Sequence, residues 1–159
     1  MTESLEGRIG AGLRSRSMTL ALAESCTGGL IGHRLTNIAG SSDYFLGGIV
    51  AYAYDAKERL LGVHHQTLYE HGAVSRETAI EMARGARQML GADIGLSVTG
   101  IAGPTGGLPG KPVGLTWIAL STREGETAEE YVWTGDREAN KARSAEAAME
   151  MLLASLGDG

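Results

Sequence analysis

The chain has 159 residues and a formal net charge of −5, with hydrophobic residues forming 43% and charged residues 21% of the sequence. We predict one domain over residues 1–159, since this length supports a single sizeable core. Basic residues are not clustered, which argues against a nucleic-acid partner. The sequence lacks both a long apolar run and a signal-peptide core, so it predicts no membrane partner and a cytoplasmic location. The lone cysteine, Cys26, fits a reducing compartment.

Helix and strand patterns alternate along the first half of the chain. Leu5, Ile9 and Leu13 recur every four residues, which predicts a helix over 3–15. The next predicted elements are a strand over 17–23, a helix over 28–38, a strand over 44–53 and a helix over 55–63. Gly47 and Gly48 indicate a bulge or a close approach within the second strand.

The second half opens with the clearest helical pattern, over 74–92, with Ser75 as N-cap and Gly91 as C-cap. Its expected buried stripe is Ala79, Met82, Ala83, Ala86, Met89 and Leu90. Strands are predicted over 93–99, 113–122 and 127–135, and a last helix, capped by Asp136, over 136–156. Residues 100–112 hold eight glycines or prolines among thirteen residues, which excludes helix and strand.

This order predicts an α/β fold, a three-layer α/β/α sandwich with a mixed, mostly parallel five-stranded sheet. Early β-α alternation gives parallel strands with helices on both faces, and the short "REGE" turn makes the last two strands antiparallel neighbours. Ligands in such folds bind beyond the carboxyl ends of the strands. Two unusual loops, 24–29 and 100–112, directly follow strands, so we expect them to line one crevice.

The stretch "ESCTGG" places Ser25, Cys26 and Thr27, three potential nucleophiles, between a strand and a helix. Free N–H groups at the helix start, together with Gly28 and Gly29, suit a phosphate, a carboxylate or a developing oxyanion. The simpler alternative is that Ser25 or Thr27 only caps the helix, and the local sequence by itself favours it.

Further polar residues stand near other strand ends. Tyr52 and Lys57 follow the second strand, and a lysine whose pKa is depressed by burial can act as a base. Thr99 ends the third strand, and Arg137 lies at the start of the last helix, where it can clamp a phosphate. For each of these residues the alternative is an ordinary structural role or a position on the solvent-exposed surface. The four histidines lack metal-ligand spacing, so no metal site is predicted.

Taken together, the segments resemble the CinA C-terminal domain family, which includes the nicotinamide-nucleotide amidases called PncC. The matching stretches are "AESCTGG" at 23–29, "AGSSDYFLGGIVAYAYDAKERLLGV" at 39–63, "HGAVS" at 71–75, "VTGIAGPTGG" at 98–107, "KPVG" at 111–114 and "GDRE" at 135–138. The resemblance implies deamidation of nicotinamide mononucleotide, an α/β/α fold, a homodimer, and no cofactor or metal. It also implies a stand-alone form without the larger N-terminal domain found in many relatives.

Residue by residue, the resemblance assigns the nucleophile to Ser25 and assisting roles to Tyr52 and Lys57, and it places Thr99 at the equivalent strand end among the catalytic residues. Our hypothesis is that Lys57 takes the proton of Ser25, with Tyr52 as a relay. Cys26 is the second choice as nucleophile. The expected substrate-binding set is Cys26, Thr27, Gly28, Gly29, Gly100, Ile101, Ala102, Gly103, Arg137 and Arg143. Backbone N–H groups at 26–29 are expected to stabilise the oxyanion, and Arg137 with the 100–107 loop to hold the pyridine mononucleotide.

The sequence departs from the family at 53–55, where Ala53-Tyr54-Asp55 replaces the usual polar pair after the tyrosine. We expect this difference to alter how the substrate fits or how fast it is turned over. The alternative function is a non-catalytic nucleotide-binding or regulatory module of the competence and damage type, which would use the same crevice without turnover.

Overall fold

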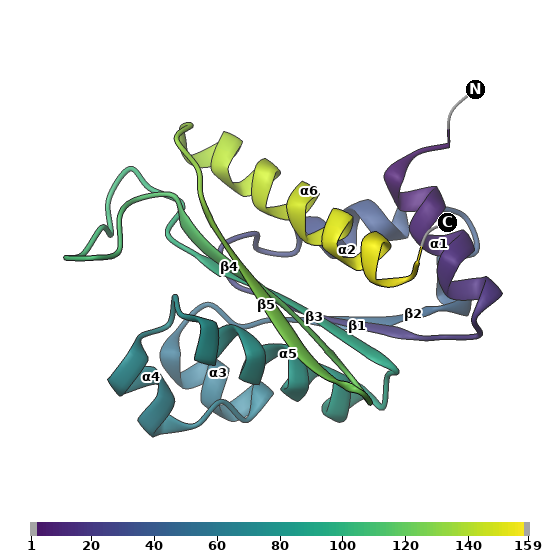
Figure 1. The fold of residues 1–159 in the computed structure, drawn as a ribbon, viewed down its shortest axis with the longest axis horizontal. Helices are drawn as coiled ribbons and strands as arrows, with labels where there is room; N and C mark the ends of the chain where they lie inside the picture. The colour runs from purple at the N-terminus through teal and green to yellow at the C-terminus, as the bar shows by residue number, and fades with distance from the viewer. Residues whose placement is uncertain (1–2, 158–159) are drawn as a thin grey trace.

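A computed structural model describes residues 3–157 and contains one five-stranded sheet between two layers of helices (Figure 1). The sheet order is β2-β1-β3-β4-β5. The strands are β1 Leu20–Glu24, β2 Phe45–Val50, β3 Ile94–Gly100, β4 Leu115–Thr122 and β5 Gly125–Val132. Strands β2, β1 and β3 are parallel, whereas β4 and β5 are antiparallel to their neighbours. The predicted mixed sheet is therefore confirmed.

Helices cover both faces of the sheet, as Figure 1 shows. One layer holds α1 Leu5–Ser15, α2 Leu30–Thr36 and α6 Arg137–Ser155. The other layer holds α3 Tyr54–Leu61, α4 His65–His71 and α5 Arg76–Leu90, and a short 3₁₀ turn, Ser41–Asp43, precedes β2. The predicted caps are confirmed: Ser75 accepts from Thr78 N, Asp136 accepts from Ala139 N, and Gly91 adopts a left-handed conformation. In the described residues, no helix has the length and apolar character needed to cross a membrane.

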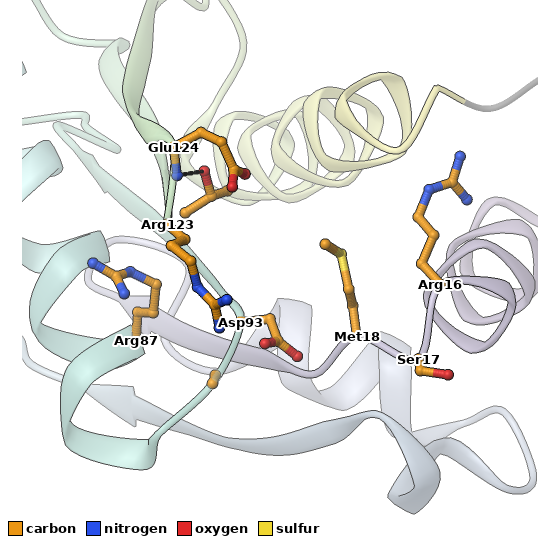
Figure 2. Close-up of a pocket in the computed structure, with 9 residues that line it drawn as sticks. Arg16, Ser17, Met18, Arg87, Asp93, Arg123 and Glu124 are labelled. Carbon is orange, nitrogen blue, oxygen red and sulfur yellow. Dashed lines mark hydrogen bonds between the residues drawn. The ribbon is translucent and has the colours of Figure 1, made fainter.

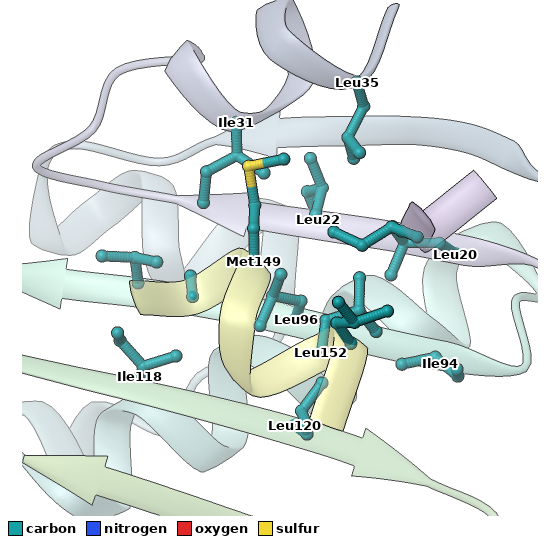
Figure 3. Packing of buried hydrophobic residues seen from close by; sticks show 14 of the residues in the cluster. Leu20, Leu22, Ile31, Leu35, Ile94, Leu96, Ile118, Leu120, Met149 and Leu152 are labelled. Carbon is teal, nitrogen blue, oxygen red and sulfur yellow. The ribbon is translucent and has the colours of Figure 1, made fainter. Parts of the chain in front are cut away.

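The two faces of the sheet pack differently. On the α6 face, large aliphatic side chains interlock, among them Leu22, Leu96, Ile118, Met149 and Leu152 (Figure 3). On the α5 face several strand residues are small, among them Ala21, Ala23 and Ala119, and the helix backbone comes very close to the sheet at Gly95. A Cβ added to Gly95 would lie 2.0 Å from the carbonyl oxygen of Ala83, so only glycine fits there.

The structure corrects three details of the predicted elements. Helix α4 was not predicted, since its seven residues show little apolar periodicity. Met89 is 61% exposed, so the predicted stripe is wrong at this position, whereas Leu90 is partly buried and packs against the core on the α5 face. The ends of the predicted strands lie up to three residues away from the observed ends. The irregularity expected around Gly47 is a register shift between β1 and β2.

The carboxyl ends of β1, β2 and β3 meet at one edge of the sheet, as expected for parallel neighbours. Backbone hydrogen bonds extend this pairing past the strands, with Ser25 N donating to Val98 O and Ala51 N donating to Glu24 O. The segments that follow the three strands are thereby held side by side, and the candidate site lies there.

Candidate active site

Ser25 and Lys57 come together at this edge from segments 32 residues apart. Lys57 Nζ lies 3.2 Å from Ser25 Oγ and also donates to the carbonyl oxygens of Ala51 and Tyr52, both at 3.0 Å. Helix α3 delivers the lysine, and its side chain is buried, with 1% of the residue's surface exposed. Ser25, directly after β1, is also buried. The predicted pairing of these two residues is present in the structure.

Burial lowers the pKa of Lys57 from 10.5 to about 8, since little solvent surrounds the ammonium group. The neutral amine keeps two hydrogens, which match the two backbone carbonyls of Ala51 and Tyr52. Its lone pair is then left for the hydroxyl proton of Ser25. Such an arrangement can activate a serine without a histidine.

Glu24 organises the turn that carries Ser25, a role that the sequence analysis did not assign. Its buried carboxylate accepts from Thr27 Oγ1 at 2.6 Å and from the backbone N–H groups of Gly29, Ile31 and Gly32. The carboxylate thus caps α2 from the preceding strand. The available signal was a charged residue at the end of a strand whose other residues are all apolar, because such a carboxylate needs partners when it is buried.

Cys26 points to the opposite layer from Ser25. Its side chain belongs to the aliphatic core on the α6 face and is 6% exposed. Burial raises the pKa of the Cys26 thiol to about 11, so it stays protonated near neutral pH. A buried, protonated thiol directed away from Lys57 is poorly suited to attack a substrate. The geometry therefore favours Ser25 over Cys26.

The turn after Ser25 uses part of the predicted anion site for itself. Gly28 N donates to Ser25 O, and Gly29 N donates to the Glu24 carboxylate. Both glycines have positive φ, 61° and 104°, so the turn requires them for conformational reasons. Within residues 3–157, the N–H groups of Cys26 and Thr27 make no hydrogen bond to another residue. Of the expected oxyanion donors, these two are the ones left for a ligand.

Tyr52 and Arg137 bond to each other across the site. Arg137 Nη2 donates to the Tyr52 hydroxyl at 2.9 Å, and Arg137 Nη1 donates to Gly103 O at 2.6 Å. In the described part of the chain, no hydrogen bond joins the Tyr52 hydroxyl to Ser25 or Lys57. The structure thus links Tyr52 to the glycine-rich loop by way of Arg137. The Tyr52 hydroxyl takes part in this link and makes no hydrogen bond to Ser25.

Thr99 is buried, and its hydroxyl donates to the carbonyl of Ala73 in the α4–α5 turn at 2.8 Å. The Tyr54 hydroxyl accepts from the N–H of the same residue, so two side chains hold this peptide unit. This turn belongs to the "HGAVS" stretch of the sequence. Thr99 thus fixes the α4–α5 turn beside the site, and within residues 3–157 it makes no hydrogen bond to Ser25 or Lys57.

The remaining predicted binding residues lie in three different surroundings. Ile101 and Ala102 are fixed by loop contacts: Ile101 bonds to the backbone of 114–115, and Ala102 O accepts from Asn140 Nδ2. Gly100 packs inward, where an added Cβ would lie 2.7 Å from Thr116 Oγ1. Arg143 is exposed on α6, and no hydrogen bond or ion pair joins it to the described site residues.

A separate concavity of about 230 Å³ lies at the other end of the sheet, lined by residues that precede β1 and β3 and by the β4–β5 turn. Figure 2 shows Arg16 and Arg87 on opposite sides of Met18, directed away from each other. Its side chains offer no pair of nucleophile and base comparable to Ser25 and Lys57. Within residues 3–157, no three His, Cys, Asp or Glu side chains are grouped so that they could hold a metal ion.

Comparison with known proteins gives the family. A family model described as the CinA C-terminal domain matches residues 2–156. The chain belongs to the CinA family. Among curated CinA-like proteins, one from Salinibacter ruber is 52% identical over 92% of this chain, and one from Geobacter sulfurreducens is 53% identical over 87%. The chain covers 36% and 34% of these two relatives, so it spans about a third of their length.

Solved CinA structures have the same fold. A competence/damage inducible protein from Agrobacterium tumefaciens is 43% identical, with a TM-score of 0.92 over 96% of this chain and 93% of its own. A CinA superfamily protein from Klebsiella pneumoniae is 35% identical, with a TM-score of 0.93 over 98% and 97%. The expected CinA family and α/β fold are confirmed by these matches.

Proposed function

We propose that this CinA domain is a serine amidohydrolase that converts nicotinamide mononucleotide to nicotinic acid mononucleotide and ammonia. The observation that carries the proposal is the contact of Lys57 Nζ with Ser25 Oγ at 3.2 Å, made by a buried lysine whose pKa is about 8. A serine next to a partly neutral amine is an activated nucleophile. The choice of substrate rests on the resemblance of the chain to the nicotinamide-nucleotide amidases.

The first half of the reaction forms an ester with Ser25. Neutral Lys57 takes the hydroxyl proton while Ser25 Oγ attacks the carboxamide carbon of the substrate. The N–H groups of Cys26 and Thr27 donate to the oxyanion that develops. The Lys57 ammonium then returns its proton to the amide nitrogen, the C–N bond breaks, and ammonia leaves.

The second half releases the acid. Lys57, neutral again, takes a proton from a water molecule as the water oxygen attacks the ester carbon. The C–O bond to Ser25 breaks, and the lysine proton passes to Ser25 Oγ. The product is nicotinic acid mononucleotide, and the enzyme returns to its starting state. The carbonyls of Ala51 and Tyr52 keep the lysine in place in both halves, since each accepts one of its hydrogens.

The test is ammonia release from nicotinamide mononucleotide by the purified protein, with Ser25→Ala as the matched variant. We expect turnover by the wild type and a loss of roughly three orders of magnitude or more in kcat for the variant. Equal ammonia release by the wild type and Ser25→Ala would rule out the serine mechanism.

The alternative is a binding or regulatory module, favoured by the competence/damage inducible name of the Agrobacterium tumefaciens structure. Such a protein would bind the nucleotide in the same crevice without releasing ammonia. Calorimetry with nicotinamide mononucleotide, run beside the ammonia assay, separates the two functions. Binding without ammonia release would favour the module, whereas release that depends on Ser25 favours the amidase.

A further inference from the structure

The Tyr52 residue connects two parts of the candidate site. Its backbone carbonyl accepts from Lys57 Nζ at 3.0 Å, and its hydroxyl accepts from Arg137 Nη2 at 2.9 Å. Arg137 is itself anchored on Gly103 O by its other terminal nitrogen. One tyrosine thus touches the base through its backbone and the guanidinium through its side chain.

The side chains of Tyr52 and Arg137 each have a hydrogen-bond donor that is not used within the described residues. The Tyr52 hydroxyl accepts from Arg137, and its own proton has no acceptor among residues 3–157. Arg137 Nε has no partner within the same residues. Tyr52 is 62% exposed and Arg137 is also exposed, so a ligand can reach both. The neighbouring Asp136 carboxylate is occupied by Ala139 N as the cap of α6.

This arrangement suits a phosphate monoester. A guanidinium offers a planar fork of N–H donors to phosphate oxygens, and a phenol adds one O–H donor beside it. The Arg137 side chain is already held in place by Gly103, which reduces the entropy lost on binding.

We propose that the Tyr52 hydroxyl and Arg137 together form the subsite for the 5′-phosphate of the substrate, and that Tyr52 determines specificity for mononucleotides over nucleosides. The inference rests on the proposed amidase function for its substrate, but the phosphate subsite can be tested by binding alone. Lys57 reaches Ser25 directly, so proton transfer between them requires no phenol relay.

The experiment compares nicotinamide mononucleotide with nicotinamide riboside, which differ only by the phosphate. In a Ser25→Ala background, calorimetry measures the binding of both compounds and of ribose 5-phosphate. We expect Tyr52→Phe to weaken mononucleotide binding about tenfold, a typical loss for one hydrogen bond to a charged group, and to leave riboside binding unchanged. Arg137→Met should weaken mononucleotide binding more strongly, again without effect on the riboside.

Tyr69→Phe is the matched control, because Tyr69 is also exposed and its hydroxyl has no hydrogen-bond partner in the described residues. Turnover adds a second readout in the Ser25 enzyme. A phosphate subsite predicts that Tyr52→Phe raises KM for the mononucleotide while kcat and its pH profile stay unchanged. A relay predicts a lower kcat on both compounds and a shifted pH profile, which would overturn the proposal.

The outcomes also separate this inference from the proposed function. If the wild type binds the mononucleotide in a Tyr52-dependent manner but releases no ammonia, the subsite stands and the amidase fails. If the wild type releases ammonia while Tyr52→Phe binds the mononucleotide as tightly as the wild type, the subsite fails and the amidase stands. Failure of ribose 5-phosphate and the mononucleotide to bind at all would overturn the subsite as well.

Discussion

Ser25 and Cys26 are neighbours in the chain, but their side chains enter opposite layers of the sandwich. Ser25 Oγ meets Lys57 of α3, whereas the Cys26 side chain packs in the aliphatic core against the α6 layer. A thiol is intrinsically the better nucleophile, but the fold places this one in the core and not beside Lys57. Under the proposed mechanism, position selects Ser25 over Cys26.

This relationship predicts that Cys26→Ala keeps catalytic activity. Cys26 contributes packing, so we expect kcat within a few-fold of the wild type and a loss of about 1–2 kcal/mol in the free energy of unfolding. Iodoacetamide should not inactivate the folded wild type, because the thiol is buried and its pKa is raised to about 11. Stoichiometric alkylation of Cys26 with parallel loss of ammonia release would contradict this assignment.

The lowered pKa of Lys57 predicts the pH dependence of the rate. The base must be neutral, and its pKa is about 8, so kcat/KM should rise about tenfold per pH unit below pH 8 and level off above it. Lys57→Met should abolish this profile together with the activity, since methionine fills a similar volume but carries no lone pair on nitrogen. A flat profile between pH 6 and about 9 for the wild type would exclude Lys57 as the base.

Glu24 is predicted to stabilise the turn that carries the nucleophile. Glu24→Ala leaves Thr27 Oγ1 and three backbone N–H groups without their acceptor, so we expect a loss of about 3 kcal/mol in the free energy of unfolding. Glu24→Gln retains one acceptor oxygen and should lose less. Urea denaturation measures both values.

Glu70→Ala is a suitable control for the Glu24 series, because this carboxylate is exposed on α4. Its removal should change the free energy of unfolding by less than about 0.5 kcal/mol. If Glu24→Ala unfolds at the same urea concentration as Glu70→Ala, the carboxylate does not support the turn.

Much of the architecture could be predicted from local patterns. Ser75, Gly91 and Asp136 marked helix ends because capping depends on the residue at the cap itself, and all three positions are confirmed. Met89 was misplaced because helical periodicity alone does not tell which side chains of the last turn are covered by neighbouring elements. The close approach of α5 to β3 at Gly95 could not be predicted either, since the distance between a helix and a strand is not encoded in a local pattern.

In the candidate site, too, residues could be named from the sequence but their contacts could not. Ser25 and Lys57 could be named from the resemblance, whereas their contact depends on α3 turning the lysine inward and on the carbonyls of Ala51 and Tyr52 receiving it. Glu24 was overlooked because its partners are mostly backbone groups, which leave no pattern in the sequence. The glycines at 28 and 29 suggested a ligand, but their positive φ values supply a conformational reason for them.

The central claim is that Ser25, activated by Lys57, attacks the amide of nicotinamide mononucleotide. Its most direct measurement is single-turnover mass spectrometry of the intact protein after rapid acid quenching, with Ser25→Ala in parallel. Fragmentation of the peptide that contains Ser25 and Cys26 then locates the adduct. We expect the wild type to gain the mass of the acyl part of the substrate on Ser25, with release of ammonia, and the variant to gain none. Ammonia release by Ser25→Ala at the wild-type rate, or acylation of Cys26 in place of Ser25, would contradict it.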